Sequence, residues 1–72
     1  MMKYETFASE ILNLAQECPR EWRLGQSVFN IVEAMCGDIA REVQFQDGID
    51  CFYDNTKIKD FLKAVYRRLN EE

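Results

Sequence analysis

Histidine is absent from this chain of 72 residues, and proline and glycine are scarce, with one and three copies respectively. Without histidine, the most common general base and the usual activator of a nucleophilic Cys or Ser are missing. The chain has no Gly-rich phosphate loop, and neither Ser9 nor Ser27 has an identifiable base. The sequence therefore predicts a protein that is not an enzyme, with no catalytic residue and no cofactor.

The cysteines are too few and too scattered to build a site. There are three of them, Cys18, Cys36 and Cys51, and no two form a CxxC pair. This odd number and wide spacing fit neither a disulfide framework nor a standard zinc site. We expect reduced thiols that pack as small apolar side chains.

Long apolar runs are missing too, and nothing approaches the roughly 20 residues that span a bilayer. Glu5 and Glu10 interrupt the N-terminal stretch where a signal peptide needs an apolar segment, so we expect a cytoplasmic protein without membrane contact. The composition, 47% hydrophobic and 31% charged, is that of a globular chain. Its length predicts a single domain over 1–72.

Charge is unevenly distributed along the chain. The net charge is −4, yet residues 55–70 hold five basic residues against one acidic residue, whereas residues 1–54 hold four against ten. The overall sign disfavours nonspecific attraction to nucleic acid.

Apolar spacing predicts an all-α fold: a compact single-domain bundle of about four short helices with an aromatic loop at 46–54. The expected helices cover 4–18, 20–36, 38–45 and 55–70. Pro19 should end the first helix and suits the first turn of the second. A helix continuing past Gly37 would place Glu42 in the apolar arc, so we expect a break at Cys36–Gly37, with Gly37 as C-cap and Asp38 as the next N-cap.

The second expected helix has an apolar sector wide enough to contact two neighbours. The residues expected in this sector are Leu24, Val28, Ile31, Val32 and Met35. In the loop that follows, three acidic residues lack the ligand alternation and closing Glu of a calcium loop, so we expect them to cap helices and form turns. These are Asp47, Asp50 and Asp54, of which Asp54 suits the cap of the last helix.

Two stretches, 22–30 and 50–61, carry a recognisable pattern. The first reads W-R-x-G-Q-x-x-F-N, and the second reads D-x-F-Y-D followed by I-x-x-F. The matching residues are Trp22, Arg23, Gly25, Gln26, Phe29, Asn30, Asp50, Phe52, Tyr53, Asp54, Ile58 and Phe61. With them the chain resembles small bacterial proteins of phage and prophage gene sets, for which no activity is established. It departs from their pattern at Cys51 in place of Pro, at Asn55 in place of Asp, and at Gly37-Asp38 where Pro-Glu is common. The resemblance implies a compact helical domain and no mechanism.

A polar stripe on the second expected helix is the first candidate partner-binding site. Its members are Arg23, Gln26, Asn30 and Glu33, spaced three, four and three residues apart. A guanidinium and two amides in one row can hydrogen-bond a peptide backbone, a base edge or a carboxylate. The alternatives are a solvated face or side chains that hold the 45–54 loop.

A basic row on the last helix, Lys59, Lys63 and Arg67, is a secondary candidate surface. It suits phosphates, but cations in the last turns also complement the helix dipole, and the acidic outer face of the first helix offers an internal or dimer partner. Four aromatic residues fit either the core or an interface, and these are Trp22, Phe29, Tyr53 and Tyr66. Gly25 predicts a close crossing by another helix or by the aromatic loop.

These observations favour a non-enzymatic module that binds another protein or a second copy of itself as a homodimer. The alternative is an accessory protein that contacts nucleic acid through its basic C-terminal helix.

Overall fold

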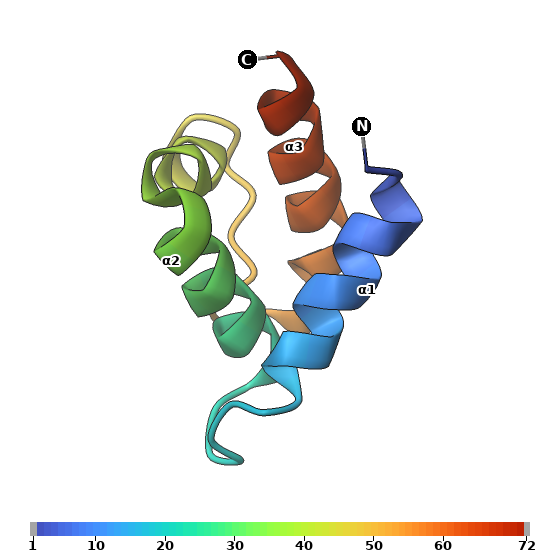
Figure 1. The fold of residues 1–72 in the computed structure, drawn as a ribbon. Coiled ribbons are helices and arrows are strands. Elements are labelled where there is room, and N and C mark those ends of the chain that lie inside the picture. Colours follow the sequence, from blue (N-terminus) through green and yellow to red (C-terminus); the bar gives the residue numbers. More distant parts are fainter. Residues whose placement is uncertain (1, 72) are drawn as a thin grey trace.

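Three α-helices and one short 3-10 helix make up the regular structure of residues 2–71, the part of the chain that the computed structural model describes (Figure 1). In chain order these are α1 (Tyr4–Ala15), α2 (Leu24–Phe45), η1 (Asn55–Lys57) and α3 (Ile58–Glu71). Each of α1, α2 and α3 packs against the other two. The predicted all-α fold is confirmed, but the number of helices is three and not four.

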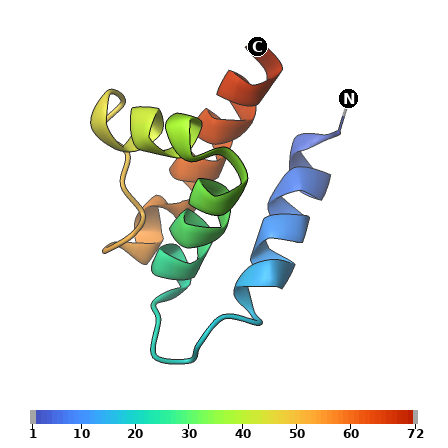
Figure 2. The same cartoon turned by 60° about the vertical axis from the view of Figure 1, so that its left-hand side comes forward.

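The second and third expected helices are joined in α2, which bends sharply between two limbs (Figure 2). The bend lies at Cys36, whose φ of −152° and ψ of 70° are not helical. The break was predicted at this point, but the caps predicted for it, Gly37 and Asp38, were wrong. Among the described glycines only Gly48 has a positive φ, so Gly37 does not form the expected left-handed C-cap. The Asp38 carboxylate pairs with Arg41 at 3.1 Å and has no hydrogen bond to a backbone N–H in residues 2–71.

The connection between α1 and α2 is longer than predicted. α1 ends at Ala15 and α2 begins at Leu24, so residues 16–23 form turns in which the Trp22 N–H donates to the Pro19 carbonyl at 3.1 Å. Pro19 thus lies in a turn and not in a first helical turn. The helix start shifts because the Gln26 side chain reaches back to accept the N–H of Arg23 at 3.4 Å, half of a capping box.

The core lies between the three helices and draws on all of them and on the loop. Its buried apolar residues are Phe7, Ile11, Ala15, Val28, Phe29, Val32, Ile39, Ala40, Val43, Cys51, Phe61, Leu62 and Val65. Two residues expected in this core lie outside it, since Leu24 is 44% and Met35 60% exposed. They stand at the two ends of the first limb of α2.

One arginine ties the second limb of α2 to α3. The Arg68 guanidinium pairs with Asp47 at 2.7 Å and with Glu42 at 2.8 Å. The hydrogen bonds that Arg68 donates to Asp47 and the charges of both carboxylates raise the pKa of Arg68, so it stays charged. This clamp uses one of the five bases of residues 55–70 inside the fold.

None of the helices in residues 2–71 combines the length and the apolar character that crossing a membrane requires.

Candidate functional site

The two stretches of the sequence pattern meet at Gly25, in the first turn of α2. The Gly25 N–H donates to the side-chain oxygen of Asn55 at 2.8 Å, and its carbonyl accepts from the Cys51 thiol at 3.3 Å. A Cβ atom on Gly25 would lie 2.0 Å from the carbonyl oxygen of Cys51, far inside van der Waals contact. The aromatic loop therefore crosses α2 at the only kind of residue that allows this approach, as the sequence predicted.

Two of the departures from the pattern lie at this junction. Asn55 supplies the acceptor for the Gly25 N–H through its amide oxygen, and a carboxylate oxygen would serve the same bond. Cys51 is fully buried and adds a thiol donor that a proline lacks. The departures thus leave the loop seated on α2.

Burial raises the pKa of the Cys51 thiol to about 12, with the Asp50 charge acting in the same direction. We expect iodoacetamide near neutral pH to label Cys18, which is half-buried, and to leave Cys51 unlabelled until urea unfolds the chain. Peptide mass spectrometry of native and unfolded samples measures this difference. Labelling of Cys51 at the rate of Cys18 in the native protein would show that the loop opens freely.

A row of contacting aromatic rings leads from the core to the surface on this side of the molecule. The ring centre of the buried Phe61 lies 5.5 Å from that of Phe29. The ring centres of Phe29 and Phe52 are 5.8 Å apart, and those of Phe52 and Tyr53 are 4.7 Å apart. Edge-to-face and tilted pairs at these separations are favourable, each by about 0.5–1.5 kcal/mol beyond area burial. The outermost ring, Tyr53, is 71% exposed but contacts Phe52 and so packs at the end of this row of rings.

Arg23 links this ring to the start of α2. Its guanidinium carbon lies 6.0 Å from the centre of the Tyr53 ring, at the limit of a cation–π contact. Trp22 and Leu24, its neighbours in the chain, are 37% and 44% exposed. We call Trp22, Arg23, Leu24 and Tyr53 together the Arg23 surface.

The four aromatic residues that fitted either core or interface divide between the two. Phe29 is core, and Tyr66 is half-buried against Tyr4 and Phe7, with both ring centres 5.6 Å away. Trp22 and Tyr53 are exposed.

The polar stripe predicted on α2 is divided by the structure into residues with different contacts. Arg23 is exposed beside Tyr53, and Gln26 accepts the N–H of Arg23. Glu33 pairs with Arg41 across the bend at 3.6 Å. Asn30 is half-buried, and its amide has no hydrogen-bond partner among residues 2–71. A role for all four in binding one partner stays a prediction. Arg23 contacts the loop at the Tyr53 ring, while the hydrogen bonds that join the loop to α2 are those of Gly25 with Asn55 and Cys51.

The basic row on α3 is exposed along its length. Lys59, Lys63 and Arg67 form no ion pair with any described residue. The acidic outer face of α1, offered as an internal partner, therefore does not neutralise them.

The loop acids are used inside the fold. Asp50 accepts from the N–H of Phe52 at 2.8 Å, and Asp54 accepts from the N–H of Thr56 at 2.9 Å, which caps η1. Hydrogen bonds from the Thr56 hydroxyl and N–H lower the pKa of Asp54. Within residues 2–71, no three acidic or cysteine side chains are arranged to hold a metal ion.

Sequence reasoning missed Leu24 as a surface residue and left Tyr53 undecided. The signal that could have placed Leu24 is Gln26, which caps the N–H of Arg23, so that the helix starts at 24 and leaves its first apolar side chain beyond the core.

Comparison of the chain with protein-family models, with curated proteins and with solved structures finds no significant match. The resemblance drawn from the sequence pattern therefore stays a prediction.

Proposed function

We propose that the protein is a non-enzymatic binding module that recognises another protein through the Arg23 surface. The single observation that carries the proposal is Tyr53, a large side chain that is 71% exposed and yet packs on the ring of Phe52, with Arg23 at the limit of a cation–π contact. A side chain fixed before binding loses little conformational entropy when a partner covers it.

The composition of the Arg23 surface supports this proposal. Trp, Tyr and Arg are the residue types that contribute most to binding energy at protein interfaces. Here Trp22 and Arg23 directly precede the exposed Leu24 of α2, and Tyr53 of the loop lies beside Arg23. A helix face that is only solvated would have no use for an exposed Trp, Tyr and Leu.

The fold supports the proposal too, because the surface has a rigid base. The loop that carries Tyr53 is fixed to α2 by the two hydrogen bonds at Gly25 and by the ring row that ends at Phe61. An epitope on such a scaffold keeps its shape between the free and the bound state. We place this activity in the cytoplasm, where three thiols stay reduced.

The test is affinity capture from cells of the organism that encodes the protein, with three baits. These are the unchanged protein, the double variant Trp22→Ala/Tyr53→Ala, and Phe45→Ala. Phe45 is the matched control because it is an exposed aromatic residue, 75% accessible, at the opposite end of α2.

We expect a protein that is retained by the unchanged bait and by the Phe45 variant and is lost from the double variant. If all three baits retain the same proteins, or if the Phe45 variant alone loses one, the Arg23 surface is not the binding site.

A further inference from the structure

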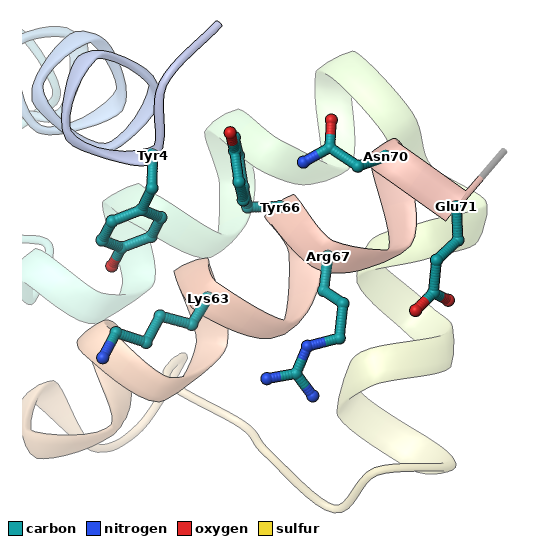
Figure 3. Close-up of a pocket in the computed structure, with 6 residues that line it drawn as sticks. All are labelled: Tyr4, Lys63, Tyr66, Arg67, Asn70 and Glu71. Carbon is teal, nitrogen blue, oxygen red and sulfur yellow. The ribbon is translucent and has the colours of Figure 1, made fainter. Parts of the chain in front are cut away.

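A second surface lies at the other end of the molecule, where both termini are found (Figure 1). There a shallow depression of about 340 Å³ opens between α1 and the C-terminal half of α3. Tyr4 reaches over from α1, while Lys63, Arg67 and Glu71 project along one side of α3 and Tyr66 and Asn70 along the other (Figure 3). Two of the lining residues are aromatic, Tyr4 and Tyr66, and their rings meet edge to face.

The cations beside this depression are free to bind an anionic partner. Lys63 and Arg67 line it, Lys59 stands one turn before them, and none of the three pairs with a described residue. Arg68, one position further on, is by contrast fully engaged by Asp47 and Glu42. Arg68 therefore has a structural role, whereas Lys59, Lys63 and Arg67 have no ion-pair partner among the described residues.

The spacing of the cations in the row equals the spacing of carboxylates at i, i+4 and i+8 on a partner helix. Residues four apart on an α-helix rise about 6 Å along its axis, so charges at i, i+4 and i+8 repeat at that interval. A partner helix with carboxylates at the same spacing has the same repeat, and an apolar side chain beside them can enter the depression. From this match of charge and spacing we infer that the depression and the Lys59–Lys63–Arg67 row bind an acidic amphipathic helical segment of a partner protein.

Nucleic acid fits this surface less well. Glu71 lines the depression and Asp60 stands within the row, so the positive surface is interrupted. The whole chain carries a charge of −4, which repels a long polyanion more than a short acidic segment. The Tyr66 ring is also engaged by Tyr4 and Phe7 and its hydroxyl donates to the Met2 carbonyl, which leaves little of it for stacking on bases.

The inference does not depend on the Arg23 surface, and the two can be tested separately. The probe is a synthetic amphipathic helical peptide with Glu at i, i+4 and i+8 and one Leu on the same face. It is titrated at low salt into isotopically labelled protein while backbone amide shifts are followed by NMR. We expect the shifts to change along residues 59–71 and around Tyr4, and to stay constant at Trp22 and Tyr53.

Two double variants with the same change of net charge make the test specific. Lys63→Gln/Arg67→Gln should weaken peptide binding roughly tenfold, the scale of two partly exposed ion pairs. Arg20→Gln/Lys57→Gln, which removes two exposed cations elsewhere, should change it less than twofold, as should Trp22→Ala/Tyr53→Ala.

Three results would overturn the inference. The first is the absence of shifts along α3 when the peptide is added. The second is equal weakening in the two charge variants, which would mean attraction by net charge alone. The third is tighter binding of a fluorescent oligo-dT than of the peptide, which would assign the surface to nucleic acid.

Discussion

Gly25→Ala is expected to lower the free energy of unfolding by about 3 kcal/mol, the upper range for forcing an extra methyl group into a packed site. The added Cβ would lie 2.0 Å from the carbonyl oxygen of Cys51, and this neighbour is backbone that no rotamer change can move. The loop must therefore shift, which breaks the hydrogen bonds of Gly25 with Asn55 and with the Cys51 thiol. The better helix propensity of Ala returns at most about 1 kcal/mol.

Such a loss is large for a chain of this size, since domains of 72 residues have total stabilities of roughly 4–11 kcal/mol. Urea unfolding followed by circular dichroism measures it. Gly37→Ala is the matched control, because a Cβ there meets only the flexible Arg41 guanidinium, at 3.3 Å, so stability should stay equal or rise. If Gly25→Ala costs less than about 1 kcal/mol, the loop is not seated on α2 as described.

Trp22→Ala/Tyr53→Ala is expected to weaken binding of the captured partner at least about a hundredfold, because two hot-spot side chains commonly contribute 2 kcal/mol or more each. The same variant should change the free energy of unfolding by less than about 1 kcal/mol, since Tyr53 is 71% exposed and Trp22, which is 37% exposed, lies outside the core. Isothermal titration calorimetry measures the first quantity and circular dichroism the second. A variant that loses stability as much as affinity would indicate a structural role instead.

The unchanged protein offers an independent measurement of the same contact. Trp22 is the only tryptophan in the chain, so its fluorescence reports on the Arg23 surface alone. Burial by a partner that lacks tryptophan should shift its emission to shorter wavelength. Unchanged emission on saturation would place the partner elsewhere.

The core of the fold could be predicted from the sequence because it rests on local periodicity. Val28 and Val32 on α2 and Phe61, Leu62 and Val65 on α3 follow the helical repeat and are all buried. The break at Cys36 was also predictable, because an unbroken helix would have carried Glu42 into the apolar arc.

The candidate site was less predictable because it depends on contacts between distant residues. The position of Leu24 follows from where α2 starts, and that start depends on Gln26 capping Arg23 and on the loop crossing at Gly25. Periodicity shows that Tyr53 lies in a loop but not that it pairs with Arg23, thirty positions earlier. The polar stripe was predicted from residue spacing, but its contacts with the bend and the cap could not be read from spacing.

The acidic and basic parts of the chain have separate roles in this account. Arg68 and the loop acids hold the fold together, whereas Lys59, Lys63 and Arg67 form no ion pair with residues 2–71.

Photo-cross-linking in the cells that encode the protein tests the central claim most directly. The photoreactive residue benzoylphenylalanine is introduced in place of Trp22 or Tyr53, and in place of Phe45 as the control. We predict a discrete covalent adduct with one other protein from positions 22 and 53 and none from position 45. Adducts from position 45 alone, or from none of the three, would contradict a protein-binding role for the Arg23 surface.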